Sequence, residues 1–517
     1  MVSLVYVSDY KYIVEHLGTA SIKAYLDNKK IPTDLYTVLM NDDLEQFVLR
    51  MPSSSLFFGF PLFHSNAQKV YKLAQLLKKH HPKCMVFTGG PFSTLAFQEI
   101  LSDCSEIDFI VLGDGEEPTY NAIDCVINKK SIKDVESVVT RMDTIIKQPG
   151  IVNLVGLPWP SREYLSQAII EGNRNAKIYA SRGCCGNCSF CSFNIYYRRS
   201  KNKCWYGRQI DDVYNEIVFL NKEYGIRDFT FVDGSFEDPG KLGKQRIDQL
   251  CDMLLSYPIR MTFWCWLRAE TFCEDDILLI QKMKRAGFIV VYIGFEANNE
   301  YDLKVYRKRN TIKDNERTIN LFLNEKIAIE YGYIMLNPYS NQKTLKENYL
   351  FLKEHNIAQT SLYTNRCMIY YSTDIYNQVY NDGLLSSTYS YLEPLNYEYV
   401  NDFAYELSHF IDENYVNSNI MGMESRYLEF QKILLRLSYL FPEKTARIDE
   451  NFNALQKQIG EIISSYFEII FIKNDILEAK SRYCEWEKVL NSYYEKGILL
   501  HMKLLKDQEI RTYLYGE

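Results

Sequence analysis

The chain has 517 residues, of which 47% are hydrophobic and 24% are charged, and its formal net charge is −7. This length predicts two or three domains, and the composition is that of an ordinary globular protein. The acidic balance gives no electrostatic basis for binding nucleic acid, and the longest apolar runs, such as LFFGFPLF near residue 60, are far too short to span a membrane.

The amino terminus and the cysteines indicate a cellular compartment. Met1 leads directly into an apolar segment without a basic region or a cleavage site, so we expect no signal peptide. The thirteen cysteines are odd in number and scattered, unlike a disulfide framework. Both features favour a reducing, cytoplasmic location.

Residues 1–130 alternate between strand and helix patterns. We expect strands at 4–8, 34–40, 55–60, 84–90 and 108–117, with helices at 17–28 and 67–80. Such alternation predicts a Rossmann-like (flavodoxin-like) domain with a doubly wound parallel sheet. Glycines at the carboxyl ends of strands allow the backbone to approach a ligand, although they are also common in ordinary turns. Those candidates are Gly59, Gly89, Gly90, Gly113 and Gly115.

Residues 131–176 are predicted to form a connector. They contain KQPG and LPWPSREYL, which are rich in proline and turn-forming residues.

The next segment, 177–193, reads KIYASRGCCGNCSFCSF and contains the most specific motif of the chain. Cys184, Cys188 and Cys191 have the spacing C-x3-C-x2-C, so three thiolates on one loop can hold three corners of a cubane iron–sulfur cluster. The fourth iron is then open to a further ligand. A zinc site is the alternative, but structural zinc usually pairs two C-x2-C motifs, and the adjacent Cys185 is poorly placed as a fourth ligand.

From residue 177 to 384 the sequence predicts six strand–helix units. The expected strands are 177–181, 228–233, 261–267, 288–294, 329–336 and 361–369. Six such units make a partial (β/α)6 barrel, whose ligands gather at the carboxyl ends of the strands. Residues 385–517 change character, because glycine becomes rare and apolar residues recur at i, i+3, i+4 and i+7. This region is expected to be an all-α domain of four to six helices.

The cysteine spacing, and its place directly after the first barrel strand, closely resemble the radical S-adenosylmethionine (SAM) enzymes. In that family the open iron of a 4Fe-4S cluster binds SAM, and reductive cleavage of SAM yields a 5′-deoxyadenosyl radical. The resemblance implies that polar residues at the strand ends contact SAM, and we identify Asp233, Arg268, Glu296 and Asn337. Each of them is also explained by an ordinary helix cap or a surface salt bridge.

The N-terminal domain resembles the cobalamin-binding domain that precedes many radical SAM enzymes. TGGPFST (88–94) and GDGEEPTYNAI, which contains Glu116, match two segments of that domain. The chain departs from the D-x-H-x-x-G motif of some cobalamin proteins, because Lys11 stands where the axial histidine would be and His16 has the wrong offset from Gly18. The resemblance therefore implies bound cobalamin without a histidine ligand to cobalt.

Three tyrosines are candidates for catalysis. Tyr292, Tyr333 and Tyr363 are expected in or near the barrel, where they could shape the substrate space or donate hydrogen, or pack in the core.

Together these resemblances imply a cobalamin-dependent radical SAM enzyme that methylates an unactivated carbon of a small molecule or peptide, with cobalamin carrying the methyl group. They also imply an external electron donor of the flavodoxin or ferredoxin type. A rearrangement or cyclisation without methyl transfer is the alternative. A methylthiotransferase would need a second set of three cysteines, which Cys84, Cys104 and Cys125 do not match. A non-enzymatic iron–sulfur sensor would need no SAM contacts at the strand ends.

Overall fold

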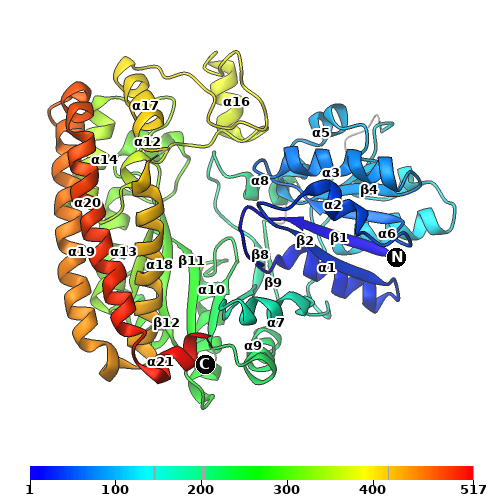
Figure 1. The fold of residues 1–517 in the computed structure, drawn as a ribbon, viewed down its shortest axis with the longest axis horizontal. Helices are drawn as coiled ribbons and strands as arrows, with labels where there is room; N and C mark the ends of the chain where they lie inside the picture. The colour runs from blue at the N-terminus through cyan, green and yellow to red at the C-terminus, as the bar shows by residue number, and fades with distance from the viewer. Residues whose placement is uncertain (144–146, 200–203, 417, 516–517) are drawn as a thin grey trace.

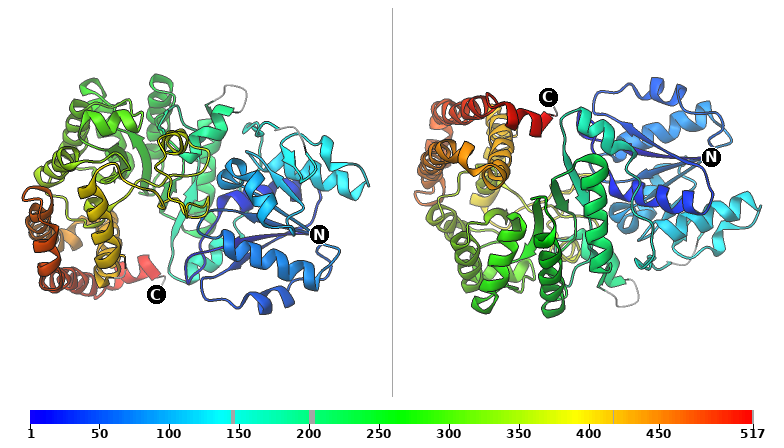
Figure 2. Two further views of the ribbon diagram at one scale, coloured as in Figure 1. Left: turned by 90° about the horizontal axis from the view of Figure 1, so that it is seen from above. Right: turned by 90° about the horizontal axis from the view of Figure 1, so that it is seen from below.

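The computed structural model describes residues 1–143, 147–199, 204–416 and 418–515. An N-terminal sheet domain occupies one end of the molecule, a long-helix bundle occupies the other, and a second sheet lies between them (Figure 1). The N-terminal domain also lies beside the central strands when the molecule is viewed from above and from below (Figure 2). Within the described ranges, no helix is both long and apolar enough to cross a membrane.

The N-terminal domain contains a six-stranded sheet in the order β2-β1-β3-β4-β5-β6, and only the β5–β6 pair is antiparallel. This arrangement confirms the predicted flavodoxin-like sheet, and the short β6 is an addition to it. The strands are β1 (Val2–Val7), β2 (Thr33–Val38), β3 (Phe57–Pro61), β4 (Met85–Gly89), β5 (Phe109–Val111) and β6 (Val138–Val139).

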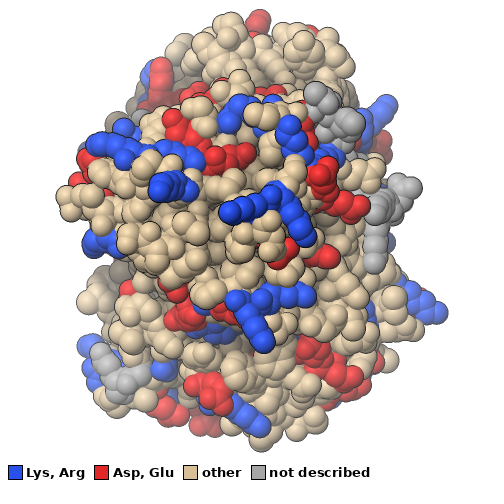
Figure 3. Space-filling model, turned by 90° about the vertical axis from the view of Figure 1, so that its right-hand side faces the viewer, with Lys and Arg blue, Asp and Glu red and all other residues tan. Residues whose placement is uncertain are grey.

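Both faces of this sheet are buried, as expected for a parallel sheet covered by helices. Val5 and Val7 of β1 face one apolar cluster, whereas Val2 and Leu4 face the other. The covering helices are α1 (Leu17–Asn28), α2 (Leu44–Leu49), α3 (Ala67–His80), α4 (Pro91–Leu95), α5 (Phe97–Asp103) and α6 (Glu116–Ile127). On the face of the molecule shown in Figure 3, basic and acidic side chains are interspersed.

The central domain contains a five-stranded parallel sheet in the order β13-β12-β11-β10-β7. Its strands are β7 (Asn175–Ile178), β10 (Asp228–Phe231), β11 (Thr262–Arg268), β12 (Phe288–Glu296) and β13 (Ala328–Tyr333). The helices that follow these strands are α9 (Ile210–Tyr224), α10 (Lys241–Ser256), α11 (Ile277–Ala286), α12 (Glu300–Val305), α13 (Ile312–Asn324) and α14 (Gln342–Glu354). A small hairpin of β8 (Ser181–Gly183) and β9 (Trp205–Gly207) flanks the cysteine loop.

The prediction of a sixth strand at 361–369 is wrong. This segment begins with a short helix, α15 (Ser361–Thr364), and only an isolated parallel bridge between Leu336 and Arg366 continues the sheet. The reason lies far away in sequence: the buried carboxylate of Glu424 accepts hydrogen bonds from Thr360 and from the backbone N–H of Ser361. A carboxylate at this position stabilises a helix amino terminus.

The remaining helices form the C-terminal bundle and its connection to the barrel. They are α16 (Asp374–Asn381), α17 (Asp402–Asn414), α18 (Asn419–Leu440), α19 (Pro442–Phe471), α20 (Ile476–Leu504) and α21 (Gln508–Tyr515). Two ion pairs attach α18 to the central sheet, Arg436 to Asp228 at 2.5 Å and Lys432 to Glu330 at 2.9 Å. The apolar core runs without interruption from the sheet into the bundle.

Candidate functional site

A cavity of about 260 Å³ lies where the carboxyl edge of the N-terminal sheet meets the cysteine-bearing domain. All six predicted residues of the N-terminal domain line it: Gly59, Gly89, Gly90, Gly113, Gly115 and Glu116. Tyr179, Arg182 and Tyr197 complete its wall from the central domain. The predicted ligand edge of the sheet therefore faces the cysteine loop, which is the arrangement that two cooperating cofactors require.

The glycines around this cavity have different roles. A Cβ at Gly59 would lie 2.3 Å from the Phe87 ring, and one at Gly113 would lie 2.4 Å from the Gly150 carbonyl, so both are needed for protein packing. A Cβ at Gly89 would meet nothing closer than 3.5 Å. Gly89 is thus the position at which a larger side chain would fill the cavity without breaking the fold, and the open space beside it fits an organic cofactor.

The structure places His16, rather than Lys11, at the cavity wall. Its Nδ1 accepts a hydrogen bond from the backbone N–H of Thr19 at 3.1 Å, and its ring stacks on Tyr6 at 4.7 Å. Burial, with the nearby charge of Lys177, lowers the pKa of His16 to about 3, so the ring is neutral. With Nδ1 as the acceptor, the proton lies on Nε2, and this assignment leaves no free nitrogen lone pair for a cobalt ion.

The cysteine loop follows β7 and β8 and is anchored to two parts of the barrel. Ser189 binds the carbonyls of Tyr306 and Val305 at 2.9 and 2.7 Å, and the N–H of Cys185 donates to Asp238 at 2.6 Å. Cys184 is buried, whereas Cys188 and Cys191 are half-buried.

Among the described residues, no group of three or more His, Cys, Asp or Glu side chains is already arranged to hold a metal ion. The ligand set therefore stays a prediction. Its chemistry suits an iron–sulfur cluster, because cysteine thiolates are the usual ligands of such clusters. Burial raises the pKa values of Cys184 and Cys188, with Asp238 adding to the rise at Cys184 and two glutamates at Cys188, whereas Arg268 lowers the pKa at both thiols and Lys308 lowers it at Cys188.

Two of the four predicted strand-end residues lie beside this loop. The backbone N–H of Arg268 donates to Glu237 at 3.0 Å, and its guanidinium donates to Asp238 at 2.7 Å. Glu296 lies 3.7 Å from the amine of Lys308 and has a backbone φ of +69°, an uncommon conformation for a residue other than glycine.

Among the described residues near this loop, both a positively charged side chain and negatively charged side chains have buried atoms without a hydrogen-bond partner. Within the described residues, Nη1 of Arg268 and Oε2 of Glu237 and of Glu270 are buried without a hydrogen-bond partner. Buried groups of this kind normally have partners, so a ligand that supplies both a carboxylate and an ammonium group fits them. The amino-acid part of SAM carries these two groups. Glu237, Asp238, Glu270 and Lys308 were not identified from the sequence, although FEDPG after the second barrel strand is an acidic pair.

Asp233 and Asn337, the other two strand-end residues, have structural partners. Asp233 accepts hydrogen bonds from the N–H of Ala180 and the hydroxyl of Ser181, and so holds the chain ahead of the cysteine loop. The side chain of Asn337 donates to Asp302 at 2.8 Å and to Tyr306 at 2.9 Å within a buried network. Direct SAM contact by these two residues therefore has no support in the geometry.

The three candidate tyrosines separate clearly. Tyr333 is buried and donates to Asn348 at 3.0 Å, and Tyr363 is buried against Phe467 of the bundle with a centroid distance of 4.7 Å. Tyr292 is half-buried and contacts Trp264 and Trp266 on the neighbouring strand, at 6.2 Å in both cases. Only Tyr292 is near an exposed part of the sheet, since Trp266 is 37% exposed.

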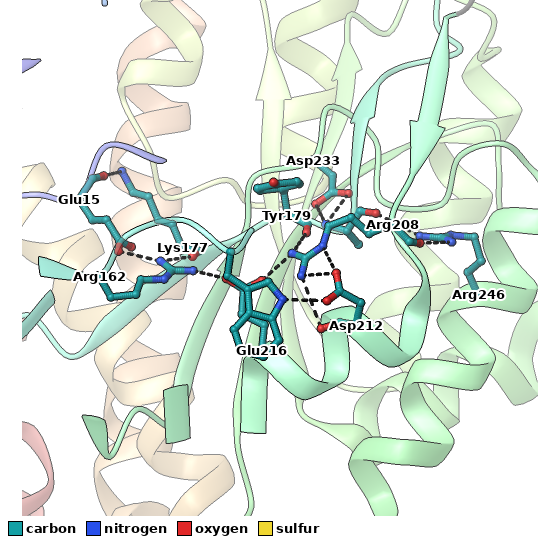
Figure 4. A network of polar contacts seen from close by, with 11 residues as sticks. Glu15, Arg162, Lys177, Tyr179, Arg208, Asp212, Glu216, Asp233 and Arg246 are labelled. Atoms are coloured by element: carbon teal, nitrogen blue, oxygen red, sulfur yellow. Dashed lines mark hydrogen bonds and ion pairs between the residues drawn. The ribbon is translucent and has the colours of Figure 1, made fainter. Parts of the chain in front are cut away.

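Two buried ionic networks join the N-terminal domain to the barrel. Arg162 of the connector lies between Glu15 and Glu216, at 2.7 Å from each, and Arg208 also pairs with Glu216 (Figure 4). Nearer the cysteines, Arg182 pairs with Asp114 and Glu116. Glu116 was predicted to contact cobalamin, but its carboxylate is occupied by Arg182.

Two known protein families match the two domains that border this cavity. The B12 binding domain family matches residues 3–123, and the Radical SAM superfamily matches residues 178–352. These matches confirm the predicted combination of cobalamin with SAM and a cluster.

Two individual relatives are each less than 30% identical to this chain. An anaerobic magnesium-protoporphyrin IX monomethyl ester cyclase of Synechocystis is 28% identical over 265 residues, covering 50% of this chain and 51% of the relative. The hopanoid C-3 methylase of Methylococcus capsulatus is 26% identical over 257 residues, covering 48% and 47%. The chain thus spans about half the length of these two relatives.

Among solved structures, the cobalamin-dependent SAM radical enzyme OxsB, with aqua-cobalamin and SAM bound, has a similar fold. Its TM-score is 0.74 at 16% identity, covering 99% of this chain and 80% of OxsB. At that identity the likeness establishes the fold alone, and the predicted fold class is confirmed.

Proposed function

Since this chain belongs to the radical SAM enzymes that carry a cobalamin-binding domain, we propose that it transfers a methyl group from SAM to an unactivated carbon of a small-molecule or peptide substrate. The observation that supports this proposal is the cavity at the edge of the N-terminal sheet. The cysteine-bearing domain forms the opposite wall of this cavity. When bound, the cluster and SAM supply the radical that activates the substrate carbon, and cobalamin supplies the methyl group.

The chain's own residues position these groups. Cys184, Cys188 and Cys191 would hold the cluster. Arg268 would bind the carboxylate of SAM with its unpaired Nη1, and Glu270 would accept hydrogen bonds from the ammonium group. Both residues are half-buried beside the cysteine loop, and the atoms that would make these contacts are themselves buried, where charge-assisted contacts are strong.

Gly89 and Gly90 would border the cobalamin tail, and His16 would present an N–H group rather than a ligand to cobalt. We therefore expect that His16 would not ligate the cobalt. The reaction also needs a low-potential electron donor, for which we propose a flavodoxin or ferredoxin type protein of the cytoplasm, where the thiols and the cluster stay reduced.

A rearrangement or cyclisation is the second candidate, favoured by the similarity to the magnesium-protoporphyrin ester cyclase. SAM with a deuterated methyl group distinguishes the two. A methylase gives labelled product together with 5′-deoxyadenosine and S-adenosylhomocysteine, whereas a cyclase gives unlabelled product and 5′-deoxyadenosine alone. The substrate source is an extract of cells that lack the gene, in which the unmodified compound accumulates.

A further inference from the structure

Two cysteines outside the predicted ligand set face each other beside the cysteine loop. The Sγ atoms of Cys185 and Cys204 are 3.4 Å apart. Both residues are half-buried, so a small reagent can reach them. Neither thiol takes part in the cofactor sites or the ionic networks described above.

The backbone holds the two residues together. Gly183 pairs with Trp205 across the β8–β9 hairpin, and the N–H of Cys184 donates to the carbonyl of Cys204 at 2.9 Å. Gly183 has a φ of +89°, and a Cβ there would lie 2.1 Å from that same carbonyl. This close approach is possible only for glycine. The hairpin and this hydrogen bond hold the main chains of the neighbouring residues side by side, and two Sγ atoms at 3.4 Å are close enough to form a bond of about 2.05 Å after a small movement.

We propose that Cys185 and Cys204 are a redox-active dithiol that closes to a disulfide while Cys184, Cys188 and Cys191 remain reduced. The oxidant is a low-molecular-weight disulfide. The thiolate of one cysteine attacks a sulfur of the reagent, breaks its S–S bond and releases one thiolate. The second cysteine then attacks the mixed disulfide and releases the other. Two protein thiols are oxidised, the reagent is reduced to two thiols, and these take up the two protons.

Closure would affect the neighbouring cluster loop in two ways. It would take the Cys185 thiol, which directly follows Cys184 in the chain, out of any reaction with iron. It would also join the two ends of the segment that carries Cys188 and Cys191, and so restrict that segment when no cluster is present. The inference rests on the predicted ligand set and not on methyl transfer, so a failure of either one is distinguishable from a failure of the other.

The test uses the full-length, reduced, iron-free chain treated anaerobically with glutathione disulfide. Free thiols are alkylated, and disulfide-linked peptides are identified by mass spectrometry. We expect the Cys185–Cys204 linkage to exceed any linkage of Cys184, Cys188 or Cys191 at least tenfold, and to be reversed by dithiothreitol. Iron reconstitution of the oxidised chain should still give about four irons per chain.

Matched variants complete the experiment. Cys185→Ser and Cys204→Ser should each abolish the linkage, whereas Cys484→Ser, at an exposed position on α20, should leave it unchanged. Circular dichroism establishes that each variant is folded, and the alanine variant at the same position replaces any serine variant that is not. The proposal is overturned if the main disulfide contains a predicted ligand, if no disulfide forms with excess reagent, or if the oxidised chain no longer binds iron.

Discussion

Arg182, two residues before the first cysteine of the loop, forms a two-pronged ion pair with Glu116 of the N-terminal domain, at 3.1 and 2.5 Å. Both side chains are largely buried, and Arg182 also pairs with Asp114. The N-terminal domain and the cysteine-bearing domain are therefore joined by charge at the wall of the cavity between them.

Glu116→Gln should destabilise the protein, because Arg182 then loses a charged partner in a buried site. Breaking a buried pair costs about 3–5 kcal/mol, and we expect about 3 kcal/mol here because Asp114 remains. Guanidinium unfolding followed by fluorescence measures the change. Glu117→Gln, at the exposed neighbouring position, is the control. Equal stability of the two variants would show that the pair does not hold the domains together.

Gly89→Leu should prevent cobalamin uptake, since its side chain would fill the cavity. Gly89→Ala should retain uptake, because its Cβ meets only ordinary contacts from 3.5 Å. The corrin absorbance that stays with each protein after desalting measures uptake. Retention of cobalamin by the leucine variant at the level of the alanine variant would place the cofactor elsewhere.

Arg268→Gln should weaken SAM binding without loss of the cluster. One charge-assisted hydrogen bond is worth about 1.5–3 kcal/mol, which corresponds to roughly a ten- to hundredfold increase in Kd. Anaerobic calorimetry measures the Kd, and iron analysis verifies the cluster. Arg260→Gln, at an exposed position, should bind SAM normally. A normal Kd for the Arg268 variant would remove this residue from the SAM site.

Asp233 predicts a pH dependence of stability. Burial raises its pKa to about 6, against the opposing effects of Ser181, Ala180 and Arg246. The folded state therefore binds this proton more tightly than the unfolded state, where the carboxyl pKa is about 3.9. Its contribution to stability falls as pH rises from about 4 to 6, by about 3 kcal/mol in total. The difference in unfolding free energy between wild type and Asp233→Asn should change by this amount across that window. A constant difference would mean that folding does not change the pKa of Asp233.

Much of the architecture follows from local sequence patterns. The alternation of strand and helix segments predicted both parallel sheets, and the cysteine spacing located the loop between β7 and α9. The strand at 361–369 could not be predicted correctly, because the carboxylate that caps α15 belongs to Glu424, some 64 residues away. Local patterns carry no information about such a contact.

The candidate site likewise contains residues that the sequence could identify and residues that it could not. Arg268 and Glu296 were selected because both were expected to end barrel strands, as they do in β11 and β12, and their contact with SAM stays a prediction. Lys308 lies beyond its strand, and contacts with Gly294 and Glu296 bring its charge close to Cys188. Asp233 and Asn337 also end strands or follow them directly, but buried neighbours take up their hydrogen-bonding groups. Position at a strand end therefore selects candidates, and the partners that folding brings to each side chain decide among them.

The requirement for cobalamin tests the central claim most directly. Enzyme reconstituted to about four irons per chain is prepared with and without cobalamin, and both forms are given SAM, a reductant and extract from cells that lack the gene. We predict that only the cobalamin-loaded form converts the accumulated compound to product. Full conversion by the cobalamin-free form would contradict the account and leave the N-terminal domain as a scaffold.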